Sequence, residues 1–219
     1  MKVIASLISW IFLPLLAPVY ALCVAMFIPS FAPDFFQRNS LYFLDFEARK
    51  ILLYLFGFFS FIAPSLTILF LQTRGLVSNV MLDNRKERVL PSFLVIIYGV
   101  SLFVILNLKI PLSFPGAVFL YGLSLGSLIS VVICSLITLK WKVSLHATGM
   151  GILSGFVFYY YANMLFFQLP VLLTLFLLSG IVMSARMYLK LHTLNQLLIG
   201  YSIGFIGTIL GIFLIDVWT

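Results

Sequence analysis

The sequence predicts an all-α membrane protein, a polytopic transmembrane helical bundle of six or seven spans. Of its 219 residues, 63% are hydrophobic and 9% are charged, and the apolar residues fall in long blocks rather than in the mixed pattern of a soluble core. A helix needs about 20 apolar residues to cross the hydrocarbon core of a bilayer, and the chain repeatedly supplies such runs. The simplest organisation is a single transmembrane domain over residues 1–219.

Seven apolar blocks are the expected spans. They run approximately over Val3–Ile28, Ile51–Leu71, Phe93–Leu108, Gly116–Leu139, Ala147–Phe167, Leu169–Met183 and Leu191–Val217. The third and sixth blocks are short, so either can be a tilted, partly buried or re-entrant segment, which leaves six and seven spans open. The longest connection, Ser30–Lys50, mixes aromatic and charged residues and is expected to form a short amphipathic element at the membrane interface.

Small residues and prolines predict how the spans pack and bend. Four pairs of glycines are spaced four residues apart: Gly122 with Gly126, Gly151 with Gly155, Gly200 with Gly204, and Gly207 with Gly211. This spacing lets helix backbones approach closely, and we expect it to serve packing within one bundle rather than a dimer motif. Pro14, Pro18 and Pro64 are expected to bend their helices.

The net charge is +7, from 13 Lys and Arg against 6 Asp and Glu. The basic residues cluster between the spans, which favours lipid headgroups, phosphate ligands or control of membrane topology as their role, and no nucleic-acid partner is expected. Cys23 and Cys134 each lie inside an apolar run, so they form neither a metal-ligand pair nor a disulfide framework.

Three polar clusters are the candidate site. With seven spans, the connections after the second, fourth and sixth spans emerge on one side of the membrane. The first cluster is Asp83–Arg88 followed by Pro91, the second is Lys140–His146, and the third is Ser184–Arg186 followed by Lys190, His192, Asn195 and Gln196. Both histidines of the protein are in these clusters.

The residue types in the clusters suit phosphate chemistry. Arginine presents a planar fork of donors that matches phosphate oxygens, and lysine supplies a point charge. The candidate phosphate ligands are Arg85, Arg88, Lys142 and Arg186. A histidine with a pKa near neutrality can attack phosphorus or act as a general acid, so the two histidines can divide these roles.

One histidine has an orienting partner in the sequence. His192 and Gln196 are four residues apart and share a helix face, so the amide oxygen can accept a hydrogen bond from the imidazole and fix its tautomer. A single histidine or basic cluster at a span end usually serves packing or topology. The expected convergence of all three clusters favours a functional site.

The three clusters resemble the signature of the type 2 phosphatidic acid phosphatase superfamily, over Asp83 to Gly200. That signature is Lys, six residues, Arg-Pro; then Pro-Ser-Gly-His; then Ser-Arg, five residues, His, three residues, Asp. Here Arg186 and His192 keep the five-residue gap, and Ser144 and His146 keep the Ser-x-His spacing. Arg88 with Pro91 loosely echoes the first element. The resemblance implies a phosphatase-like core at about residues 74–217.

The resemblance also implies residue roles. His192 would attack phosphorus to form a phosphohistidine, and His146 would protonate the leaving oxygen. Arg88, Ser144 and Arg186 would bind the phosphoryl oxygens, together with the backbone N–H after Ser144. Fixed positive donors act most strongly on the charge that gathers on the equatorial oxygens of the transition state. Neither a cofactor nor a metal is required.

The sequence departs from the signature in each element. Met81 stands where the first element has Lys, and Pro91 is displaced by two residues. Val143 and Leu145 replace Pro and Gly in the second element. In the third element Ala185 separates Ser184 from Arg186, and Gln196 replaces Asp.

Gln196 lacks the negative charge that stabilises an imidazolium, so slower chemistry is expected than with Asp. The alternative is a noncatalytic lipid-binding or membrane-complex assembly subunit with a degenerate phosphatase fold. A transporter is disfavoured because the spans are almost free of charge, and a prenyltransferase because no pair of Asp-rich loops exists.

The expected partners are the bilayer and a phosphorylated lipid, either as substrate or as bound ligand, while protein partners stay open. The lipid can be phosphatidate, phosphatidylglycerophosphate, an isoprenyl diphosphate or a lipid A phosphate. The expected location is a bacterial inner membrane. Nine Lys and Arg lie on the site side against four opposite, but without the four candidate phosphate ligands the ratio is five to four, so the side of the site stays open.

Overall fold

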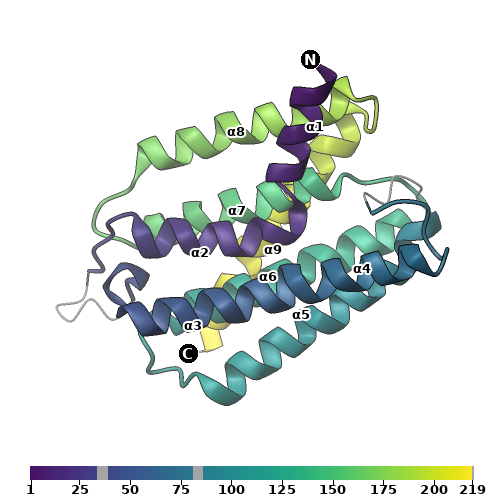
Figure 1. The fold of residues 1–219 in the computed structure, drawn as a ribbon. Coiled ribbons are helices and arrows are strands. Elements are labelled where there is room, and N and C mark those ends of the chain that lie inside the picture. Colours follow the sequence, from purple (N-terminus) through teal and green to yellow (C-terminus); the bar gives the residue numbers. More distant parts are fainter. Residues whose placement is uncertain (34–38, 81–85, 219) are drawn as a thin grey trace.

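The computed structural model describes residues 1–33, 39–80 and 86–218, and within them the regular secondary structure is entirely helical. The α-helices are α1 (Lys2–Ile11), α2 (Ala17–Phe27), α3 (Phe46–Gly57), α4 (Ala63–Thr73), α5 (Val89–Lys109), α6 (Ala117–Thr138), α7 (Leu145–Ala162), α8 (Leu169–Tyr188) and α9 (Leu194–Trp218). Short helices are η1 (Pro14–Leu16), η2 (Leu41–Phe43), the π-helical η3 (Phe58–Ile62) and η4 (Lys86–Arg88). Together they form a bundle of roughly aligned rods (Figure 1).

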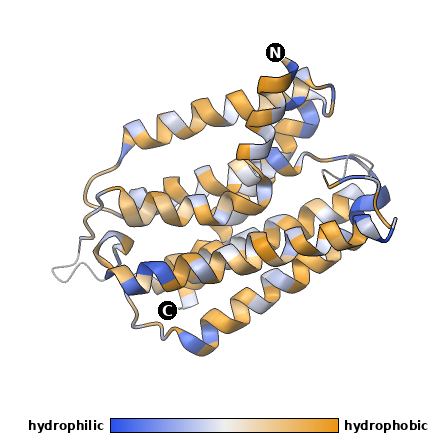
Figure 2. Ribbon diagram, viewed as in Figure 1, coloured by the Kyte–Doolittle hydropathy of each residue, from blue (hydrophilic) through white to orange (hydrophobic). Residues whose placement is uncertain are grey.

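The predicted all-α transmembrane bundle is confirmed, and the protein is an integral membrane protein. Six segments among the described residues are long and apolar enough to cross a membrane: Lys2–Phe27, Phe46–Thr73, Lys86–Lys109, Ala117–Thr138, Leu169–Tyr188 and Leu194–Trp218. The third and sixth apolar blocks are therefore full-length helices, α5 and α8, and not short segments. Hydrophilic residues gather at the two ends of the bundle, and apolar residues cover the helices between them (Figure 2).

The seventh helix, α7, differs from the six candidate spans because it is buried by protein. Most of its residues are buried, and it packs against α9, α2, α8 and α6. Its 18 residues give it a length of about 27 Å, which is close to the thickness of the hydrocarbon core. A helix surrounded by other helices does not need a lipid-like composition, which explains its three consecutive tyrosines, Tyr159–Tyr161.

The predicted glycine pairs are packing positions within the bundle, as expected. A Cβ atom on Gly151 would lie 2.1 Å from the Tyr201 carbonyl oxygen, and one on Gly204 would lie 2.1 Å from that of Thr148. The same holds where α6 crosses α9, because a Cβ on Gly211 would lie 2.3 Å from the Gly126 nitrogen. Close backbone approach at these glycines brings α9 against α6 and α7.

The first and second spans are irregular at their prolines. The first span breaks after Ile11 and resumes through η1, which begins at Pro14, so that α1 and α2 point in different directions (Figure 1). In the second span the π-helical turn η3 precedes Pro64, whose missing N–H and bulky ring disturb the regular hydrogen-bond ladder. Pro18 lies in the first turn of α2, where proline is tolerated.

The connection expected at Ser30–Lys50 is shorter than predicted. Asp45 caps α3 by accepting a hydrogen bond from the Ala48 N–H at 2.7 Å, so the last residues of the predicted connection are already helical. Ser30 and Leu41 are buried, and both bond to the Tyr160 hydroxyl, at 2.7 and 2.9 Å. The described part of this connection is therefore anchored on α7, and the only helical turn in it is η2.

Candidate functional site

The described residues of the three polar clusters meet at one end of the bundle. The connections that follow α4, α6 and α8 lie at the same end (Figure 1). Two hydrogen bonds join them: the Arg88 guanidinium donates to the Val143 carbonyl at 2.9 Å, and the Ser144 N–H donates to the Gln196 carbonyl at 3.3 Å. Segments that are about 50 residues apart in sequence are thus joined in one polar layer.

A cavity of about 120 Å³ opens beneath this layer. Its polar wall contains Arg88, His146, Arg186 and His192, each of which is at most 6% exposed. Buried charges are costly unless they are solvated by partners, so two buried arginines beside two histidines mark a site rather than a packing accident. The two guanidinium groups of the cavity make its lining cationic and can bind an anion.

His192 is held in one tautomer. Its Nδ1 lies 3.2 Å from Gln196 Oε1, as the spacing in the sequence suggested, and the Thr193 N–H donates to the same oxygen at 3.3 Å. Because two donors converge on Oε1, the amide orientation is defined, and Nδ1 of His192 must carry the hydrogen. The lone pair of His192 is therefore on Nε2.

Burial and positive neighbours keep His192 uncharged. Removal from water is the main cause of the shift, and the positive charges of Arg88, Lys142 and Arg186 add to it, so that the pKa of His192 is lowered from 6.5 to about 3. The hydrogen bond to Gln196 opposes the shift. At neutral pH the imidazole is a neutral nucleophile or ligand beside positive groups.

We expect His192 in the ligand-free protein to stay uncharged down to about pH 4. Its imidazole in the unfolded chain takes a proton as pH falls through 6.5, so this group lowers the free energy of unfolding between about pH 6.5 and 3 and has no effect above that window. NMR of labelled histidine in His146→Gln protein, where one imidazole signal remains, measures this. A titration midpoint near 6.5 would contradict the burial argument.

His146 faces the cavity from the first turn of α7 and has a different partner. Its Nε2 lies 3.1 Å from the Ser9 carbonyl of α1, and because a carbonyl only accepts, Nε2 carries the hydrogen. The break in the first span makes this contact possible, since Pro14 packs against Gly149, one turn along α7. The Nε2 of His146 therefore carries a proton that is donated to the Ser9 carbonyl.

Among the described residues of the three clusters that remain, Pro91 lines the cavity, whereas Lys142, Ser144 and Gln196 are not part of its lining. The Ser144 hydroxyl caps α7 by accepting from the Ala147 N–H at 3.4 Å, and it places the first N–H groups of the helix beside the cavity. Lys142 is half-buried nearby and contributes its charge. Arg85 lies outside the described residues.

Sequence reasoning missed the contribution of the first span. Leu13, Pro14 and Leu15 form one wall of the cavity, and the Ser9 carbonyl holds His146. Nothing in the local sequence marks a backbone carbonyl as a site group. The only available signal was Pro14, which predicted a bend but not what the bend covers.

Among the described residues, no three His, Cys, Asp or Glu side chains lie close enough together to hold a metal ion. The donor set of the cavity, guanidinium and imidazole groups, suits an anion.

Comparisons with protein-family models, with curated proteins and with solved structures find no match for this chain. Its class therefore follows from the fold and the site alone. It is a polytopic α-helical membrane protein with a buried cationic cavity at one end of the bundle.

Proposed function

We propose that the protein is a membrane-embedded lipid phosphate phosphatase that acts through a phosphohistidine on His192 and needs no metal. One observation carries the proposal: a neutral imidazole with its Nε2 lone pair available lines the same buried cavity as two arginines. The resemblance of the three clusters to type 2 phosphatidic acid phosphatases points the same way. The proposed location is a bacterial inner membrane.

In the first step, the His192 Nε2 lone pair attacks phosphorus and the bond from phosphorus to the lipid oxygen breaks. Arg88 and Arg186 neutralise the charge on the equatorial oxygens, aided by the N-terminus of α7. For this step His146 must carry a proton on both ring nitrogens, a state that the negative charge of the bound phosphate favours. It gives its Nε2 proton to the leaving oxygen, for which that hydrogen must leave the Ser9 carbonyl, and it is left as a neutral imidazole with a proton on Nδ1. The products are a lipid alcohol and a phosphohistidine.

In the second step, water attacks the phosphohistidine, and His146, now the base, takes a proton from it. The nitrogen–phosphorus bond breaks, inorganic phosphate leaves, and His192 is restored. The overall reaction consumes one phosphate ester and one water. Gln196 keeps Nδ1 protonated throughout, so that Nε2 is always the reacting atom.

The direct test is phosphate release from a panel of lipid phosphates and diphosphates in detergent or liposomes, with and without EDTA. We expect release to be equal in both conditions, since the guanidinium groups supply the positive charge that a metal would supply elsewhere. Acid-labile radiolabel on wild-type protein after brief reaction would support the phosphohistidine. Activity that EDTA abolishes and a divalent ion restores would contradict the mechanism.

A noncatalytic lipid-phosphate-binding subunit is the second candidate, and one contact favours it. The proton that His146 would donate is already engaged by the Ser9 carbonyl, and Gln196 brings no negative charge to His192. Such a protein would bind a phosphorylated lipid and release no phosphate. Tight binding with no turnover across the panel would establish this reading.

A further inference from the structure

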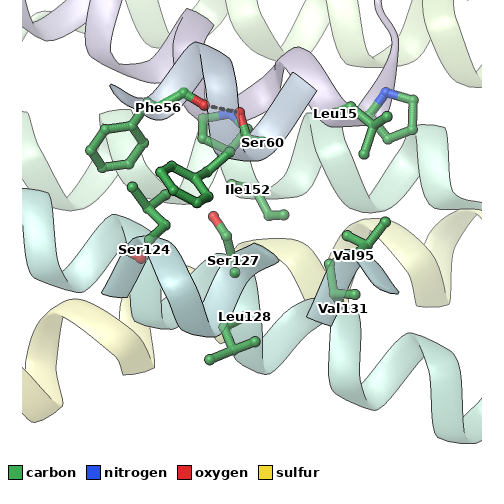
Figure 3. Close-up of a pocket in the computed structure, with 14 residues that line it drawn as sticks. Leu15, Phe56, Ser60, Val95, Ser124, Ser127, Leu128, Val131 and Ile152 are labelled. Carbon is green, nitrogen blue, oxygen red and sulfur yellow. Dashed lines mark hydrogen bonds between the residues drawn. The ribbon is translucent and has the colours of Figure 1, made fainter. Parts of the chain in front are cut away.

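A second cavity, of about 70 Å³, lies deeper in the membrane and adjoins the first. The two cavities share Pro14, Leu15, Val95, Val131 and Ile152 as walls. The deeper one is otherwise lined mostly by apolar side chains from the second span, α5 and α6 (Figure 3). The cationic cavity is therefore next to an apolar one inside the bundle.

Two serine hydroxyls in the deeper cavity behave differently from other serines of the same helix. Ser130 and Ser135 of α6 donate to the carbonyls four residues earlier, at 2.7 and 2.6 Å, as serines in membrane helices commonly do. Ser124 and Ser127 line the cavity with buried hydroxyls that have no hydrogen-bond partner in the described structure. Ser124 is only 3% exposed.

A third serine of the cavity, Ser60, lies in a part of the second span where the α-helix is interrupted. Ser60 belongs to the π-helical turn η3, and its hydroxyl donates to the Phe56 carbonyl at 2.7 Å, the contact drawn in Figure 3. In the same view Ser127 points across the cavity toward Ile152. Single π-turns within membrane helices often occur at ligand sites because they open local space.

We propose that one hydrocarbon chain of the bound lipid phosphate enters this deeper cavity, and that the chain carries an oxygen which accepts hydrogen bonds from Ser124 and Ser127. The phosphate lies among Arg88, Arg186 and His192, so this inference rests on the proposed phosphate site. It names the ligand class more closely: a phosphate amphiphile with a hydrogen-bond acceptor inside its chain.

The depth of the serines locates the acceptor. Val131 borders both cavities, and Ser127 lies four residues before it on α6, about 6 Å deeper along the helix axis. Ser124 lies about 4.5 Å deeper again. The acceptor therefore belongs to the chain, beyond the linkage to the phosphate. A plain alkyl chain would leave both buried hydroxyls unsatisfied, which is the unfavourable alternative.

Alkylphosphonates test this, because their carbon–phosphorus bond is not hydrolysed and binding is read without turnover. The probes are butylphosphonate, dodecylphosphonate, and dodecyl analogues in which one chain methylene is replaced by an ether oxygen at successive positions. Calorimetric titration gives Kd for wild type, Ser127→Ala and Ser124→Ala. Ser135→Ala is the matched control, since Ser135 lies on the same helix but bonds its own backbone.

We expect one or two ether positions to bind about five-fold tighter than dodecylphosphonate to wild type, the value of one hydrogen bond. Ser127→Ala or Ser124→Ala should remove that preference, Ser135→Ala should keep it, and butylphosphonate should bind all four proteins equally.

A flat ether series, or serine variants that weaken butylphosphonate equally, would overturn the inference while leaving the phosphate site intact. A serine-dependent ether preference in a protein that releases no phosphate would support the inference and refute the enzyme. Binding of none of the phosphonates would refute the phosphate site and, with it, the inference.

Discussion

His192→Ala is expected to abolish phosphate release, with a loss of at least about 1000-fold, because it removes the atom proposed to attack phosphorus. Release is compared at equal amounts of folded protein, judged by a monodisperse peak in detergent. Asn195→Ala, at an exposed position in the first turn of α9, is the matched control and should retain activity. Full turnover by the alanine variant would exclude His192 as the nucleophile.

Variants of Gln196 test the role of the amide in the same phosphate-release measurement. Gln196→Ala should lower the rate about ten-fold, because it removes one hydrogen bond that orients the imidazole but leaves the nucleophile in place. Gln196→Asp should preserve or raise the rate, since a carboxylate accepts the same bonds and stabilises an imidazolium. Gln196→Glu keeps the reach of glutamine and controls for the shorter aspartate.

Two patterns would decide against this account of Gln196. If the carboxylate variants were slower than Gln196→Ala, the negative charge would be harmful and the amide would have a role beyond orientation. If wild type and both carboxylate variants were inert while a lipid phosphate still bound near Arg186, the noncatalytic reading would replace the phosphatase.

Gly204→Ala should destabilise the folded protein by roughly 1–3 kcal/mol or more, as overpacking does where nothing can move aside. A Cβ at this position would lie 2.1 Å from the Thr148 carbonyl oxygen and 2.8 Å from the Ile152 nitrogen, both backbone atoms of α7. The helices must then separate just below His146. Thermal unfolding of the detergent-purified protein measures the effect.

Gly180→Ala is the matched control, because an added Cβ there meets nothing within 4 Å. It should leave the melting temperature unchanged or slightly raised, given the better helix propensity of alanine. Equal melting temperatures for the two variants would mean that α7 and α9 are not held at this close distance.

The fold followed from the sequence because lipid imposes a simple rule: every backbone group must bond within the chain, so long apolar blocks must be helices. The packing role of the glycine pairs could also be predicted from the sequence, because glycines four residues apart lie on one helix face and let another backbone approach closely. The interpretation of α7 as one more span was incomplete, because a helix buried by protein and a helix facing lipid differ in surroundings, not in length.

The candidate site was readable in part. The hydrogen bond between His192 and Gln196 was predicted from their spacing, but the expected shared helix face was wrong. His192 precedes α9, and the Gln196 side chain reaches back to it from the first turn of that helix. The clusters follow the second, fourth and sixth predicted spans, and connections separated by two spans lie on the same side of a membrane. The order of the spans therefore predicted that the clusters share one end. Neither argument specifies which residues are buried or which line a common cavity.

The sequence by itself determined the membrane class, the helical elements and the set of polar residues at one end, because composition and periodicity act locally along the chain. Only the tertiary structure decided that α1 lies against the site, that the Ser9 carbonyl holds the His146 proton, and that the cationic cavity lies beside an apolar one. Those features depend on where a broken helix points and on which side chains leave space between helices, and packing among distant segments alone sets both.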